Sequence, residues 1–169
     1  LSNDKYDKSD LGYFTNNNTI DQGIWMAYNR NKPKGWYNYF KMNWEVWYSR
    51  LVSPIDILQR KEMMFQNAGG NINANAQTKK LWNVGGTIDI GLNYNDFYEA
   101  RSAGRVFHNK GRIGLSGWWN SNQAKKLSWG GSFFTGTGGV FKRTNINGGL
   151  FGKIRFNSKF SVDYAVNLE

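Results

Sequence analysis

The sequence contains no cysteine, only two prolines and a single histidine among 169 residues. Without cysteine there is no disulfide framework and no thiolate chemistry. One histidine leaves little choice for a catalytic triad or a histidine-based metal site. Aromatic residues make up 17% of the chain, and few prolines combined with many aromatics are typical of a β-rich protein.

Long hydrophobic runs are also missing. No segment approaches the roughly 20 apolar residues of a transmembrane helix, which excludes a helical span. The mean hydropathy of −0.64 still permits a membrane barrel, because strands of a barrel alternate and average out as polar. The start shows no basic segment followed by an apolar core, so no signal peptide is expected, and a mature form, a fragment or a cytosolic protein stay open.

The residues that are present alternate. In WNVGGTIDIGLNYN (residues 82–95), bulky side chains stand at even positions and mostly polar ones at odd positions. Side chains on a strand point to opposite faces in turn, so the stretch has one apolar and one polar face. The third of the resulting strands is expected to begin near Met63 and to bulge at Gly69 and Gly70. Eight strands are predicted, near residues 23–29, 35–49, 70–77, 82–95, 112–120, 127–134, 146–156 and 160–168.

The connections between these strands alternate in length. Short ones lie near residues 30–35, 77–80, 121–126 and 157–159, and longer ones near 50–66, 96–110 and 136–145. Short turns at one end and long loops at the other are typical of outer-membrane barrels. Trp36, Trp82 and Trp129 each follow a short turn on the apolar face, where they would form an interfacial girdle. We therefore predict an all-β fold: one antiparallel up-and-down transmembrane β-barrel domain over residues 1–169, complete with eight strands or part of a larger barrel.

The polar face would then line the barrel interior. It is rich in asparagine and carries mixed charges, which suits a wet or salt-bridged lumen. Trp25, Trp47 and Trp118 fall on the same face, where they either stack on sugars or nucleobases, or fill a narrow lumen or cap a girdle. The lumen-facing candidates are Lys41, Glu45, Asp89, Arg112, Lys153, Arg155 and Asp163.

The formal net charge is +10, and every short turn carries lysine. Nucleic-acid binding would need lysines interleaved with aromatics on one accessible face, whereas here the lysines cluster in turns. Attraction of Lys79, Lys80, Lys125 and Lys126 to anionic headgroups explains them better. Outer-membrane lipid is the predicted partner, and nucleic acid is not.

Three other patterns favour ordinary structural roles. His108 is expected in a long loop without a second ligand. The spacing of Asp4, Asp7 and Asp10 does not fit a calcium-binding loop. Gly152-Lys153 is followed by Ile154 within an alternating strand, so it does not form a phosphate-binding loop. We expect no cofactor, no metal site and no enzymatic activity.

Three stretches carry a family resemblance: DLGYFTNNN (residues 10–18), TKKLWNVGGTID (78–89) and FYEARSAGRVF (97–107). They resemble the C-terminal barrel region of Bacteroidetes-type outer-membrane proteins of unknown function, whose N-terminal domain is like a family-9 carbohydrate-binding module. Ala100 stands where the pattern has proline. The resemblance implies an outer-membrane location in a Gram-negative bacterium and a longer protein. Its loop supplies candidate partner residues: Tyr98, Glu99, Arg101, Gly104 and Arg105.

The leading functional hypothesis is a pore or ligand-docking barrel related to glycans. Three alternatives stay open: a scaffold barrel that anchors a membrane complex through the loop around residues 98–107, a soluble ligand-binding β-barrel, and a membrane-embedded hydrolase or acyltransferase that would depend on His108. An open strand edge in lipid leaves backbone groups unpaired, so a partial barrel would need further strands or a partner chain.

Overall fold

The computed structural model describes residues 19–52, 64–97, 105–138 and 143–168. Over these ranges the chain is all-β, and none of the described residues is helical. No helix in this part of the chain is therefore long and apolar enough to cross a membrane. The strands are β1 (Thr19–Arg30), β2 (Tyr37–Leu51), β3 (Met64–Thr78), β4 (Asn83–Gly91), β5 (Tyr94–Asp96), β6 (Phe107–Asn109), β7 (Arg112–Asn120), β8 (Leu127–Gly138), β9 (Arg143–Arg155) and β10 (Ser161–Leu168).

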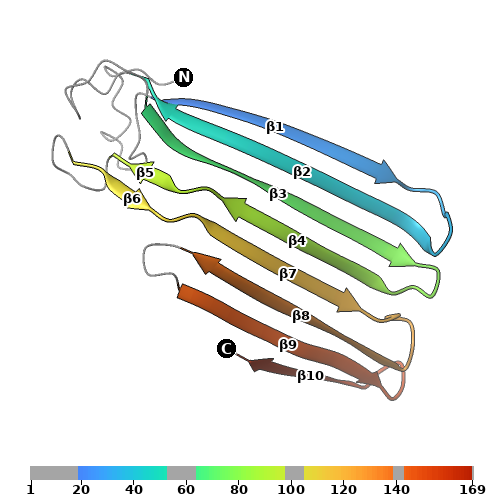
Figure 1. Cartoon of the computed structure of the whole chain (residues 1–169). Helices are drawn as coiled ribbons and strands as arrows, with labels where there is room; N and C mark the ends of the chain where they lie inside the picture. The colour runs from blue at the N-terminus through green and yellow to red at the C-terminus, as the bar shows by residue number, and fades with distance from the viewer. Residues whose placement is uncertain (1–18, 53–63, 98–104, 139–142, 169) are drawn as a thin grey trace.

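Eight of these strands form one antiparallel sheet in the order β1-β2-β3-β4-β7-β8-β9-β10, and β5 and β6 form a separate two-stranded ribbon. Figure 1 shows the eight strands side by side in a single layer. Apart from the β5–β6 ribbon inserted between β4 and β7, neighbours in the sheet follow one another along the chain, so the predicted antiparallel up-and-down arrangement is confirmed. Short connections require antiparallel neighbours, which is why the turn spacing predicted this topology.

The described strands form an open sheet. β1 pairs only with β2, and β10 pairs only with β9. No pairing between β1 and β10 closes the sheet within the described ranges. Over the described residues the architecture is therefore an open antiparallel sheet.

The strand register extends the alternation across the whole sheet. Ile72 on β3 lies opposite Trp44 on β2 and Ile88 on β4, and Ile88 lies opposite Leu115 on β7. On the other side, Asn71 lies between Glu45 and Asp89. We call the first side the apolar face and the second the polar face. Further members of the apolar face are Ile24, Met26, Met42, Val46, Ile90, Ile113, Phe133, Leu150, Ile154, Val162 and Val166.

Neither face is packed against another layer of the described chain. Only Leu51, Ala76 and Phe97 are buried apolar residues there. On the apolar face Ile88 is 44% exposed and Val166 61% exposed. An apolar sheet face is normally covered by a second layer, so this one needs a covering that the described residues do not supply.

Three details of the sequence prediction were wrong. The bulge lies at Gln66 rather than at Gly69 and Gly70, because the register shifts where Ser49 pairs with Asn67 and Arg50 with Phe65. The extra residue buries the Gln66 amide 3.0 Å from the Ser49 hydroxyl.

The strand predicted over residues 82–95 ends at Gly91, and β5 pairs with β6 instead. Asn93 Oδ1 accepts a hydrogen bond from the Gly111 backbone at 2.7 Å and so replaces a ladder bond. The connection predicted over 136–145 is shorter, because β8 extends to Gly138 and β9 begins at Arg143.

Candidate functional site

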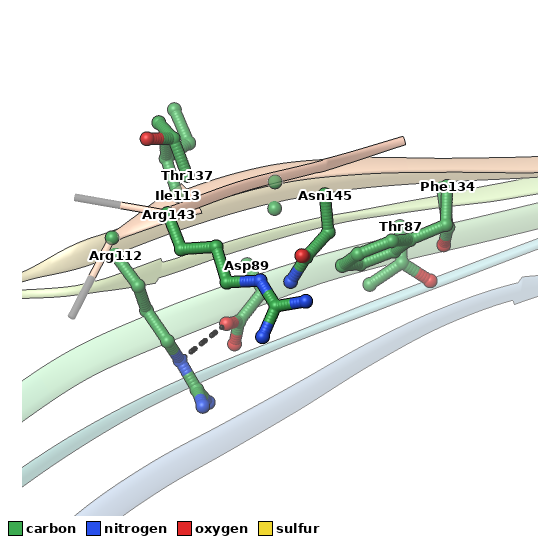
Figure 2. A pocket seen from close by; sticks show the side chains of 12 residues that line it. Thr87, Asp89, Arg112, Ile113, Phe134, Thr137, Arg143 and Asn145 are labelled. Carbon is green, nitrogen blue, oxygen red and sulfur yellow. Dashed lines mark ion pairs between the residues drawn. The ribbon is translucent and has the colours of Figure 1, made fainter. Parts of the chain in front are cut away.

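A hollow of about 640 Å³ lies on the polar face where β4, β7, β8 and β9 run side by side. Figure 2 shows its lining from close by. Because successive side chains alternate in direction, these four strands supply polar groups to one side of the sheet. Six residues labelled in Figure 2 lie on the polar face: Thr87, Asp89, Arg112, Phe134, Arg143 and Asn145. Ile113 and Thr137 also border the hollow, but the register places their side chains on the apolar face.

Two facing glycines create the space. Gly114 on β7 lies opposite Gly136 on β8, so two neighbouring polar-face positions have no side chain. A Cβ added to Gly114 would lie 3.5 Å from Phe134 Cε2, an ordinary contact, whereas one on Gly136 would lie 3.0 Å from Phe134 Cζ. The Phe134 ring therefore occupies part of the room that the glycines leave and forms an apolar wall.

The hollow has an excess of positive charge. Arg112 Nε lies 3.1 Å from Asp89 Oδ1 in an ion pair whose side chains are 67% and 30% exposed. Arg143 lines the same hollow and forms no ion pair with any described residue. One carboxylate therefore faces two guanidinium groups. Such a surface can hold an anionic or hydroxyl-rich ligand through charge-assisted hydrogen bonds.

A second ion pair lies nearer the β10 edge. Lys153 on β9 is directly opposite Asp163 on β10, and Lys153 Nζ lies 3.2 Å from Asp163 Oδ1. A smaller hollow of about 360 Å³ includes this pair and Phe151. In each pair one side chain is 67% exposed and the other about a third exposed, so each pair contributes at most about 1 kcal/mol to stability.

The register places all seven charged candidates on the polar face. It joins four of them in two pairs, Asp89 with Arg112 and Lys153 with Asp163. The other three form no ion pair with another candidate among the described residues. Glu45 accepts a long hydrogen bond of 3.4 Å from Asn71, Lys41 lies 5.8 Å from the ring centroid of Tyr39, and Arg155 lies opposite Ser161.

The structure describes only some of the candidate residues in the long connections. Tyr98, Glu99, Arg101 and Gly104 lie outside the described residues, and Arg105 is exposed. His108 belongs to the short strand β6 rather than to an irregular loop, and its Nδ1 lies 2.6 Å from Asn95 Oδ1. No three His, Cys, Asp or Glu side chains gather to hold a metal within the described ranges.

The polar-face tryptophans differ in their surroundings. The Trp47 ring lies against Gly69 and the Trp118 ring against Gly85, since a Cβ on either glycine would come within 2.6 Å of ring carbon. These two rings lean over neighbouring strands. Trp25 is 62% exposed and is open to stacking on a ligand.

Sequence reasoning missed Phe134, Arg143 and Asn145 as site residues. It read residues 136–145 as a loop, so the polar alternation of Arg143 and Asn145, which continues to Asn147 in the predicted strand, went unused. That alternation is the signal that could have extended the strand.

The model of one family, described as "Domain of unknown function (DUF5916)", matches residues 1–169, the whole chain. No curated protein and no solved structure matches the chain.

Proposed function

The chain belongs to the family described as domain of unknown function (DUF5916), and from that premise we propose that its sheet is part of the wall of an outer-membrane β-barrel. In this proposal the apolar face contacts lipid and the polar face lines a water-filled interior. The hollow at Asp89, Arg112 and Arg143 docks a polar ligand that passes through or binds there. A glycan is the ligand class favoured by the resemblance to outer-membrane proteins with a carbohydrate-binding domain, which is analogy.

The distribution of charge between the two faces carries the proposal. Asp21, Lys41, Glu45, Asp89 and five further charged residues of the sheet lie on the polar face. Of the charged side chains in the eight-stranded sheet, only Arg30 and Arg50 share the apolar face, and both lie at strand ends. A water-exposed face has no reason to exclude charge from its middle, whereas a lipid-exposed face does.

The spacing of those two arginines fits a bilayer. Arg30 lies opposite Phe40, and Arg50 is ten residues further along β2. Ten residues span about 33 Å along a strand. A strand tilted by about 40° then rises roughly 25 Å, the height of the apolar band of a membrane barrel.

In the proposed barrel the free edges of β1 and β10 are paired, with each other or with further strands. Unpaired backbone groups in hydrocarbon cost several kcal/mol each. The first test is fractionation. We expect the protein in the outer-membrane fraction, dependent on detergent, with a heat-modifiable band on a gel; recovery as a detergent-free soluble protein would refute the proposal.

Conductance tests whether ions pass along this hollow. Asp89→Asn leaves the two arginines of the hollow without their carboxylate, so we expect the anion-to-cation permeability ratio in planar bilayers to rise about five-fold. A unit charge some 8 Å away in water changes the energy of each ion by about 0.5 kcal/mol, with opposite signs for anions and cations. Asp89→Glu keeps the charge and should leave the ratio unchanged. Folded protein that carries no current, or equal ratios in both variants, would rule out an ion path along this hollow.

A further inference from the structure

The four short turns of the sheet gather at one end. They join β1 to β2, β3 to β4, β7 to β8 and β9 to β10, and Figure 1 shows them together, opposite the long connections. Residues 31–36, 79–82, 121–126 and 156–160 contain seven lysines and no Asp or Glu. We call these lysines the lysine rim: Lys32, Lys34, Lys79, Lys80, Lys125, Lys126 and Lys159.

No ion pair neutralises the positive charge of the lysine rim within the described residues. All seven side chains are exposed, and none forms an ion pair with a described residue. The turns that carry them are held by short-range backbone bonds: Lys34 and Tyr37 exchange two, and the Leu81 N–H donates to Thr78 O at 2.9 Å. The lysine charges are therefore carried by hydrogen-bonded turns at the short-turn end of the sheet.

Exposed aromatic side chains lie at the same end. Trp36 is 57% exposed, and Phe156 and Phe160 stack with 5.4 Å between ring centroids while each stays 56% exposed. Trp82 and Trp129 meet edge to face at 5.2 Å on the apolar side. The amphipathic tryptophan rings beside unpaired cations match the headgroup region of a bilayer, where such rings sit at the interface and lysines meet phosphate.

We infer that the short-turn end binds anionic phospholipid headgroups. The inference rests on the proposed membrane location and adds to it the lipid class and the end of the sheet that meets it. A nucleic acid fits less well, because it would need stacking rings between the lysines on the polar face. Here the rings border the apolar face, where acyl chains would continue from the headgroup.

The test is native mass spectrometry of the detergent-solubilised chain titrated with phosphatidylglycerol or phosphatidylcholine. We expect preferential retention of phosphatidylglycerol. Each lysine near an anionic surface contributes roughly a five-fold gain in affinity, so Lys79→Gln with Lys80→Gln should weaken binding about 30-fold. Raising the salt should weaken binding to the unaltered protein as well.

The matched control is Arg105→Gln with Lys110→Gln, which removes the same charge from the other end of the sheet and should change binding by less than about two-fold. Equal losses in the two double variants, or no preference for phosphatidylglycerol, would overturn the inference. So would tighter, rim-dependent binding of a single-stranded oligonucleotide. Circular dichroism checks that the variants keep their strands. Because binding is measured in detergent, it can fail while fractionation still succeeds, so the two proposals fail separately.

Discussion

Replacing Ile88 by arginine is expected to destabilise the protein in lipid by about 3 kcal/mol. Ile88 lies in the middle of the apolar face, between Ile72 on β3 and Leu115 on β7, and is 44% exposed. An arginine at the bilayer midplane on the lipid side of a barrel costs about 2–4 kcal/mol. The measurement is urea unfolding of the protein refolded into lipid vesicles, followed by tryptophan fluorescence.

Two controls make the result specific for lipid. Thr87→Arg alters the neighbouring residue of the same strand at the same depth, but on the polar face, and should cost less than about 1 kcal/mol. Leu127→Arg changes a residue of the apolar face at the start of β8, beside the lysine rim. This position would lie near the membrane surface, where an arginine on the lipid side costs about 1 kcal/mol or less. A protein layer over the apolar face would penalise Leu127→Arg as strongly as Ile88→Arg. Equal costs for those two variants would therefore reject lipid contact.

Much of this fold could be predicted from the sequence, because both of its main signals are local. Alternation with a period of two gives a strand and its faces, as in β2, where Met42, Trp44 and Val46 alternate with Lys41, Asn43 and Glu45. Short turns then force consecutive strands to pair antiparallel. Once the register is set, the charged residues of different strands fall on the same face.

The errors concern features that depend on contacts between strands. The bulge at Gln66 follows from burial of its amide beside Ser49, which the sequence of β3 does not reveal. The hollow needs Gly114 and Gly136 to face each other, and that depends on the register of β7 with β8. Its ion pair joins Asp89 and Arg112, 23 positions apart in the sequence, through the same kind of alignment.

Gly69→Ala is expected to lower the free energy of unfolding by about 3 kcal/mol, although alanine usually suits a strand better than glycine. The added Cβ would lie 2.5 Å from Trp47 Cζ2 and 2.6 Å from the backbone oxygen of Ile90. Overpacking costs about 1–3 kcal/mol, and the upper end applies because a backbone carbonyl of β4 cannot rotate away. Chemical denaturation in the same vesicles measures the loss.

Gly23→Ala is the matched control, because Gly23 flanks Trp47 from β1 as Gly69 does from β3. Its nearest atom would be the Val46 oxygen at 3.6 Å, so we expect no loss and a gain of up to about 1 kcal/mol. Trp47→Ala combined with Gly69→Ala removes the ring but keeps the carbonyl. If the losses from Trp47→Ala and Gly69→Ala add in the double variant, crowding against the ring is not the obstacle. If the two changes compensate, Gly69 is the residue that lets Trp47 lie across β3 and leave the polar face open to a ligand.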